Sequence, residues 1–144
     1  IALFPSMWIL FGLLAGLTAA LMTISAKIGL KSIDPVLATT VRSIIMAACM
    51  VGVATATQKW HALNTIDSRG WKWMIAAALF GALSWLFYFF GLQQASATRL
   101  AALDRLSLPI IVLLSALVLH ETISPRVIAG TILATGGILL MTLK

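Results

Sequence analysis

Long apolar stretches separated by short polar turns form most of the chain. Five stretches are close to the length of about 20 residues that an α-helix needs to cross about 30 Å of hydrocarbon. The expected helices cover about 4–30, 36–57, 71–94, 98–119 and 125–143. Every connection is short except the one over 58–70, so neighbouring helices are expected to be antiparallel. The pattern predicts an all-α integral membrane protein with five transmembrane helices, folded as a single transmembrane domain over residues 1–144.

Proline and tryptophan mark the expected helix ends. Asp34-Pro35 precedes the second stretch and Ser124-Pro125 precedes the fifth. Proline disfavours helical geometry in the residue before it and suits the first turn of the next helix. Tryptophan is typical of the membrane–water interface, so the segment over 71–73 is expected to anchor the third helix there.

The composition excludes a soluble domain. The chain is 61% hydrophobic and 10% charged, with a mean hydropathy of +1.06, whereas soluble domains are roughly 45–50% apolar and about 25% charged. The net charge of +6 comes mostly from cations near segment ends, where they reach the lipid headgroups, so we expect the lipid bilayer and no nucleic acid as a partner. The single Cys49 is expected to be buried apolar filler. His61 and His120 lack neighbours at ligand spacing, so no metal or cofactor is expected.

The positive charges give no preferred orientation. With five spans the termini lie on opposite membrane faces. Eight of the ten Lys and Arg residues divide four to four between these faces, Lys59, Arg69, Lys72 and Arg126 against Lys27, Lys31, Arg99 and Lys144, and Arg42 and Arg105 lie deeper. The positive-inside rule therefore favours neither orientation. Insertion in both orientations would suit an antiparallel homodimer, which forms an inverted repeat of the kind that transporters use.

Two charged residues are expected inside the hydrocarbon at the same depth. Arg42 lies seven residues after Pro35, and Asp104 lies about six residues into the fourth helix, so both lie about 9–10 Å deep at ~1.5 Å per residue. Each ionised group costs roughly 2.5–3.5 kcal/mol there. Either the pair is a structural ion pair, or it borders a water-accessible pathway for substrate or protons, which is the interpretation that we favour.

Lys27 is expected slightly shallower on the same side. It ends a stripe of small residues on the first helix, so it faces either the bundle interior or, as a snorkelling anchor, the headgroups. With Lys27 and Arg42 against Asp104 the local charge is positive. This balance favours a substrate that carries a carboxylate or a phosphate, or a zwitterion.

Polar and aromatic side chains extend the candidate pathway along two helices. Trp85, Tyr88 and Phe89 follow one another at helical spacing in the third helix. They serve either as packing or as an aromatic wall for a ligand, with the Tyr88 hydroxyl as its polar group. Asp104, Ser107 and Ser115 fall on one face of the fourth helix, where Pro109 removes a backbone hydrogen bond.

Two stripes of small residues are expected to pack helices closely or to form a dimer interface. The first contains Gly12 and Gly16 in the first helix. The second contains Gly130, Ala134 and Gly137 in the fifth helix.

Three segments together carry a resemblance to a known family: AKIGLKSIDPVLATTVRS over 26–43, LSWLFYFFGLQQASATRLAALDRLS over 83–107 and LHETISPRVIAGTILATGGILL over 119–140. Their order and spacing resemble a single EamA-type repeat of the drug/metabolite transporter superfamily, over nearly the whole chain. Full-length members have ten helices from two such repeats in inverted orientation and export metabolites. The resemblance therefore implies one half of an inverted-repeat transporter fold, which dimerises to complete the fold, in a multi-pass protein of a prokaryotic plasma (inner) membrane.

The leading hypothesis is a dimeric transporter, an exporter of a small polar, anionic or zwitterionic metabolite that works by alternating access. The alternative is a non-transporting membrane subunit that assembles with a partner membrane protein. An enzyme is not expected, because no nucleophile–base pair, paired carboxylates or metal motif is present. A weaker resemblance to small multidrug resistance proteins does not support cation efflux, because the first helix here lacks their membrane-embedded carboxylate.

Overall fold

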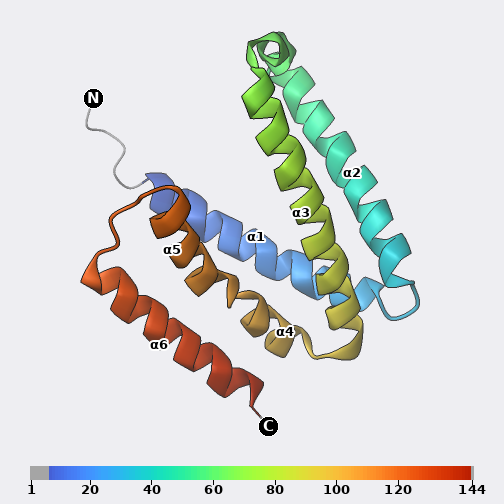
Figure 1. Ribbon diagram of the computed structural model, residues 1–144. Helices are drawn as coiled ribbons and strands as arrows, with labels where there is room; N and C mark the ends of the chain where they lie inside the picture. Colours follow the sequence, from blue (N-terminus) through green and yellow to red (C-terminus); the bar gives the residue numbers. More distant parts are fainter. Residues whose placement is uncertain (1–6, 144) are drawn as a thin grey trace. The chain divides into compact units, whose positions relative to one another are not determined.

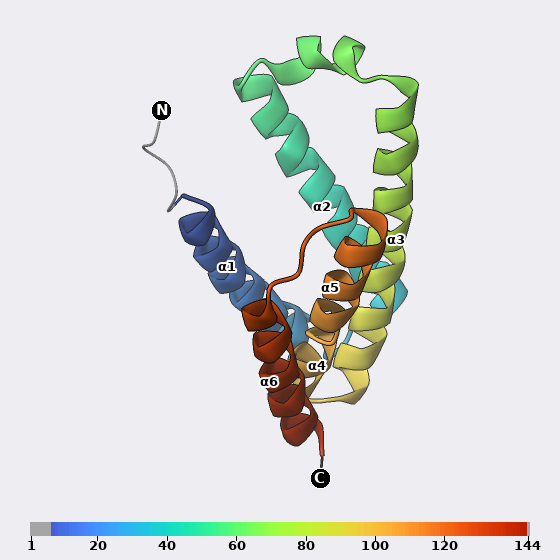
Figure 2. The ribbon, with the colours of Figure 1, turned by 60° about the vertical axis from the view of Figure 1, so that its left-hand side comes forward.

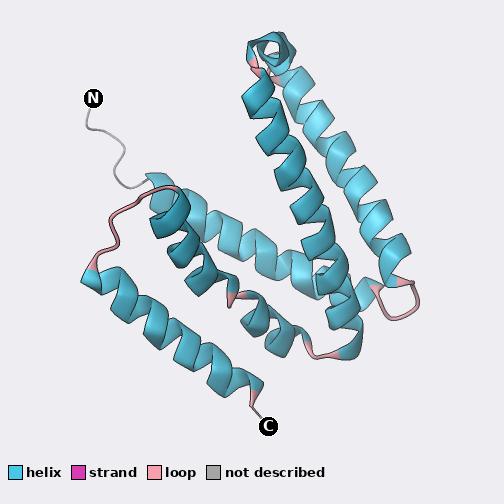
Figure 3. Cartoon of the chain, viewed as in Figure 1, coloured by secondary structure: helices cyan, strands magenta, loops and turns pink. Residues whose placement is uncertain are grey.

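The computed structural model describes residues 7–143, and every regular element in that range is helical (Figures 1 and 3). The elements are α1 (Met7–Gly29), α2 (Pro35–Ala56), the 3₁₀-helix η1 (Lys59–Thr65), α3 (Ser68–Gln94), α4 (Ala97–Asp104), α5 (Ser107–Val118) and α6 (Pro125–Thr142). With α4 and α5 counted as one span, five spans are long and apolar enough to cross a membrane. The predicted all-α class with five spans is confirmed. The expected helix start at residue 4 lies outside the described residues.

Both Asp-Pro and Ser-Pro pairs begin a helix, as predicted. Asp34 has extended backbone geometry, and its carboxylate accepts hydrogen bonds from the backbone N–H groups of Val36 and Leu37 at 2.9 and 3.1 Å. Ser124 also has extended backbone geometry, and its hydroxyl oxygen accepts a hydrogen bond from the backbone N–H of Val127 in α6 at 3.4 Å. The first N–H groups of a helix have no partner within the helix, so these side chains stabilise the helix start.

A similar cap starts α3 three residues before the expected position. The Asp67 carboxylate accepts a hydrogen bond from the backbone N–H of Gly70 at 2.8 Å. A Cβ atom at position 70 would lie 2.9 Å from this carboxylate oxygen and 3.1 Å from the Ile66 side chain. Glycine therefore permits the close approach that the cap requires, and the cap places the start of α3 at Ser68.

The fourth span is interrupted, where the sequence predicted one helix over 98–119. α4 ends at Asp104 and α5 begins at Ser107. Pro109 has no N–H to donate to the Arg105 carbonyl, and its ring would clash with that carbonyl in a regular helix. The N–H of Leu108 bonds to the Arg105 carbonyl instead, at 3.0 Å. The break therefore lies one turn before the proline that explains it.

The helices form two compact units. The central unit comprises Ile24–Gln94 and contains the end of α1, α2, η1 and α3; the terminal unit comprises the described residues up to Thr23 and from Ala95 onward. In the central unit α2 and α3 pack against each other in opposite directions. Figure 2 shows that they separate toward η1 and approach each other toward the start of α2. In the terminal unit α6 packs along α4 and α5.

The described side chains show the burial pattern of a membrane protein. Leu92 is fully buried and Phe89 is 3% exposed, whereas Leu133 and Phe80 are 76% and 74% exposed. In lipid such outward apolar groups are stable because hydrocarbon is their solvent. Cys49 is exposed, contrary to the prediction that it is buried, because α2 presents most of its surface outward.

Candidate functional site

Arg42 of α2 lies against the aromatic face of α3. Its guanidinium carbon is 3.7 Å from the ring centroid of Trp85, and both side chains are half-buried. A cation over an indole ring is stabilised by roughly 0.5–1 kcal/mol at an exposed site and by about 2 kcal/mol when it is desolvated. The contact lies where α2 and α3 converge, so it joins two spanning helices within the central unit.

One edge of this guanidinium lacks a hydrogen-bond acceptor. The Arg42 Nη1 atom is buried, and no residue in the described range accepts its hydrogen bonds. A buried donor without an acceptor costs about 1–3 kcal/mol, and more when the group is charged. The sequences of α2 and α3 contain no Asp or Glu, so these helices offer no carboxylate to the cation. An anion from elsewhere would satisfy it.

The Trp85 ring is fixed by two neighbours on the same helix. The Tyr88 and Phe89 rings lie 5.6 and 6.2 Å from it, at interplanar angles of 70° and 72°. These edge-to-face contacts are the favoured geometry for aromatic pairs. Phe89 is buried, whereas Trp85 and Tyr88 are half-buried. The three rings therefore pack against one another, and Trp85 and Tyr88 stay partly accessible. Contact of these rings with a ligand stays a prediction.

Lys27 is half-buried and binds the end of α3. Its Nζ atom donates a hydrogen bond to the backbone carbonyl of Leu92 at 2.5 Å. This carbonyl belongs to the last turn of α3, whose final carbonyl groups have no partner within the helix. A cation is also favoured there by the helix dipole. This contact gives Lys27 a structural role at the C-terminal end of α3. Its role in a pathway stays a prediction.

The candidate residues of the fourth span lie on both sides of its break. Asp104 is the last residue of α4 and Ser107 is the first of α5, and both are exposed. Ser115 is half-buried in the last turns of α5. The polar stripe expected on one helix is thus divided between two. Asp104 and Arg42 belong to different compact units, and their pairing stays a prediction.

The glycines of both small-residue stripes face open space. A Cβ atom added at Gly12, Gly16, Gly130 or Gly137 would meet nothing within 4 Å in the described part of the chain. Ala134, between the last two, is half-buried. These positions leave room for the close approach of another helix, although an interface through them is untested.

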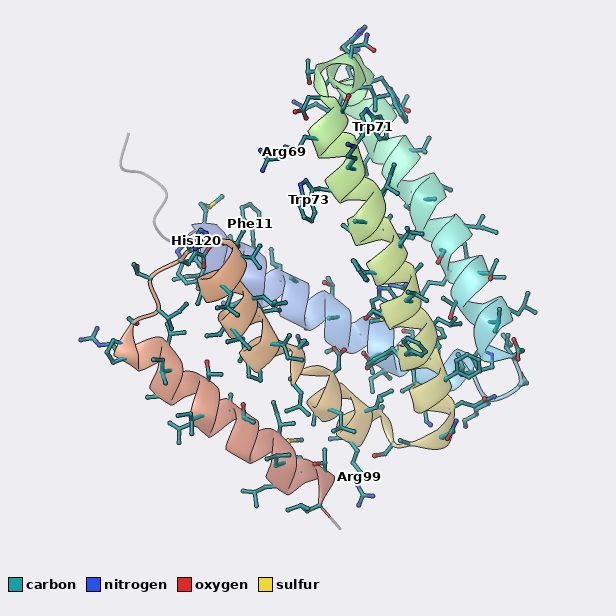
Figure 4. All side chains as sticks on the ribbon, viewed as in Figure 1. Phe11, Arg69, Trp71, Trp73, Arg99 and His120 are labelled. Atoms are coloured by element: carbon teal, nitrogen blue, oxygen red, sulfur yellow. The ribbon has the colours of Figure 1, made fainter. Side chains whose placement is uncertain are left out.

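Aromatic and basic residues gather at the η1 end of the central unit. Figure 4 shows Arg69, Trp71 and Trp73 around the first turns of α3. The two tryptophans are 47% and 66% exposed. This is the distribution expected of an interfacial belt, and it places the Arg42–Trp85 contact toward the opposite end of α2 and α3.

The Arg42–Trp85 contact was not predicted, although the depth of each residue in the membrane can be calculated from the sequence. Arg42 lies seven residues after the start of α2 and Trp85 nine residues before the end of α3, which are about 10 and 13 Å at 1.5 Å per residue. Antiparallel packing brings these depths together. The contact of Lys27 with the Leu92 carbonyl could not be predicted in this way. Every residue has a backbone carbonyl, and the sequence does not mark which one accepts a hydrogen bond.

Comparison with known proteins agrees with this architecture. Residues 6–143 match the model of the EamA-like transporter family. A curated relative, named "Uncharacterized transporter in cobO 3'region" and found in Sinorhizobium sp., is 30% identical over 134 residues, which is 93% of this chain and 95% of the relative. No solved structure matches the chain significantly. The match over nearly all of the five-span segment shows that the chain is a membrane protein of the EamA-like transporter family.

Proposed function

We propose that the protein exports a small anionic or zwitterionic metabolite across the plasma (inner) membrane of a prokaryotic cell. The observation that carries this proposal is the Arg42 guanidinium, which lies inside a spanning helix, against Trp85, with a buried N–H edge that has no acceptor among the described residues. Intramembrane cations commonly mark substrate pathways. Membership of a transporter family and the name of the relative support transport as the activity.

The charge of the central unit supports an anionic group on the substrate. Its spanning helices carry Lys27, Arg42, Arg69 and Lys72 but no carboxylate, and its acidic residues Asp34 and Asp67 cap the starts of helices. A simple cation would be repelled from this region. The pathway that we propose runs past Arg42 and the aromatic wall within the central unit. A part in it for Lys27, or for Ser107 and Ser115 of the terminal unit, stays a prediction.

Proton coupling through Asp104 is part of the proposal. Asp104 is the only acidic residue within the candidate spans, and it lies at the C-terminal end of α4, beside a helix break. Discontinuous helices in transporters often hold coupling ions at such ends.

We propose that two copies assemble as an antiparallel homodimer that works by alternating access. The described residues hold five candidate spans, and the eight Lys and Arg residues expected near the membrane faces divide evenly between them. Two oppositely inserted copies would form the inverted repeat on which alternating access depends. The open glycines of α1 and α6 offer surfaces for this assembly.

The second candidate is a non-transporting subunit that assembles with a different membrane protein. The same open glycines favour it, since they would accept a helix of any partner. If the protein is such a subunit, we expect charge changes at Arg42 and Asp104 to alter its assembly, and we expect no flux.

Flux measurements in proteoliposomes test the proposal. The purified chain is reconstituted and assayed with radiolabelled monocarboxylates, amino acids and phosphate monoesters. We expect flux of at least one anionic or zwitterionic compound, with at least a tenfold loss in Arg42→Gln and in Asp104→Asn. Arg69→Gln removes the same charge from the interfacial end of α3 and should retain flux. Correct insertion with no flux of any compound would contradict transport and favour the subunit.

A further inference from the structure

We infer that Arg42 and Trp85 form a binding site for a monocarboxylate with an apolar body, in which Trp85 holds the guanidinium in position for the carboxylate. The inference rests on the proposed function for its biological meaning, and it narrows the substrate to one chemical class. Both residues belong to the central unit, so the site is built on α2 and α3 alone.

The flat face of the Arg42 guanidinium and its N–H edge have different roles. Its face is occupied by the Trp85 ring at 3.7 Å, so a ligand can approach only at the N–H edge or on the opposite face. The Nη1 donors at the edge lack an acceptor among the described residues. A guanidinium presents a planar fork of donors, and a planar carboxylate can accept two parallel hydrogen bonds from it.

Charge balance favours a carboxylate over a phosphate. A carboxylate has one negative charge, which a single guanidinium neutralises, whereas a phosphate monoester carries about −1.5 to −2 near neutral pH. The Lys27 ammonium lies farther along α3, where it donates to the Leu92 carbonyl, seven residues beyond Trp85, or about 10 Å at 1.5 Å per residue. A dianion would therefore keep an excess negative charge inside a spanning region, and a carboxylate would not.

The aromatic wall selects the rest of the ligand. Trp85 and Tyr88 are half-buried and held edge to face, and the buried Phe89 also contacts the Trp85 ring edge to face. Small-molecule sites combine mainly apolar walls with a few polar groups that set orientation. Here Arg42 would orient the carboxylate and the two accessible rings would contact an apolar body.

Three probes with the same phenyl body separate the possible ligand classes: benzoate, phenyl phosphate and benzylamine. Radiolabelled benzoate is equilibrated by dialysis with the purified full chain in detergent micelles, and binding to empty micelles is subtracted. We expect saturable binding that unlabelled benzoate displaces, that phenyl phosphate displaces at least tenfold less well, and that benzylamine does not displace. Equal displacement by phenyl phosphate would overturn the inference without requiring any variant.

Variants then assign the binding to the two side chains. Arg42→Gln and Arg42→Lys should each weaken benzoate binding at least tenfold, because the lysine retains the charge but not the donor fork. Arg69→Gln is the control for net charge. Trp85→Leu should also weaken benzoate binding, because the ring that holds the guanidinium is lost, and Trp85→Phe should restore most of the binding. Unchanged benzoate binding in Trp85→Leu, or full binding in Arg42→Lys, would show that charge alone holds the ligand.

Failure of the proposed binding site and failure of the proposed transport give different experimental results. Benzoate binding that depends on Arg42, without flux in proteoliposomes, would leave the site in place and contradict transport. Flux that is insensitive to Arg42→Lys would leave transport in place and contradict the site.

Discussion

At the scale of single residues, the cations of the central unit are engaged in different ways. Arg42 lies on an aromatic ring and retains a donor edge without an acceptor in the described range, whereas Lys27 donates to a helix-terminal carbonyl. The first arrangement leaves a buried donor edge that a substrate could satisfy. The second resembles a helix cap, so we expect Lys27 to contribute more to stability than to substrate selection.

Replacement of Lys27 tests this distinction. Lys27→Met removes the hydrogen bond to the Leu92 carbonyl, and loss of a bond from a charged donor costs about 1.5–3 kcal/mol. We expect a lower thermal unfolding temperature in detergent, measured by circular dichroism. Lys31→Met removes an exposed cation that lies outside the helices and should leave this temperature unchanged. Equal destabilisation by both variants would argue against the contact.

At the scale of elements, local side-chain chemistry determines where the helices begin and end. Asp34, Asp67, Ser96 and Ser124 each accept a hydrogen bond from an N–H group in the first turn of a helix. Interruption of the fourth span also has a local cause, since Pro109 removes the donor for the Arg105 carbonyl. A break of this kind lets the two halves of the span adopt different directions within the membrane.

The cap of α3 gives a prediction about Gly70. Gly70→Ala would place a Cβ atom 2.9 Å from the Asp67 carboxylate, so the cap must loosen although alanine favours helices. Loss of an N-cap costs about 0.5–2 kcal/mol. We expect a net fall in the unfolding temperature of the chain in detergent.

The control for this prediction is Gly52→Ala in the interior of α2, where the added methyl group meets nothing within 4 Å. Alanine stabilises a helix interior by roughly 0.5–1 kcal/mol relative to glycine, so the unfolding temperature should rise or stay constant. An equal rise in both variants would show that the Asp67 cap does not limit α3.

At the scale of the whole molecule, the described residues form a smaller buried core than soluble proteins have. The hydrophobic residues buried in the described range are Leu30, Phe89, Leu92, Ala102 and Ile138. Lipid covers part of the exposed apolar surface, and the proposed second copy would cover another part. Close helix contacts in lipid depend on small residues, since the solvent is as apolar as the side chains.

The α6 stripe tests the proposed dimer. Gly130→Leu combined with Gly137→Leu adds bulk to two open positions of this stripe, and we expect a fall in the dimer fraction after chemical crosslinking in membranes. Gly136→Leu adds the same bulk at a neighbouring open position of the same helix, outside the stripe, and should retain the dimer. A dimer fraction that the double variant leaves unchanged would exclude α6 as the interface.

The sequence by itself determined the all-α class, the five spans and the helix starts at Pro35 and Pro125. These features depend on local causes: the length of apolar runs and the geometry imposed by proline, both of which act within a few residues. The sequence also identified Arg42, Trp85 and Tyr88 as candidates, because a charge or an aromatic stripe within an apolar run is visible without coordinates.

Only the tertiary structure decided which side chains meet. It placed Arg42 on Trp85 and Lys27 on the Leu92 carbonyl. Spacing gives the depth of Arg42 and of Trp85, but both contacts also depend on the rotation of one helix relative to another. The exact position of the break before Pro109 likewise required the hydrogen bonds of the backbone. Local patterns determine helices, whereas contacts between residues as distant as Arg42 and Trp85 depend on how those helices pack.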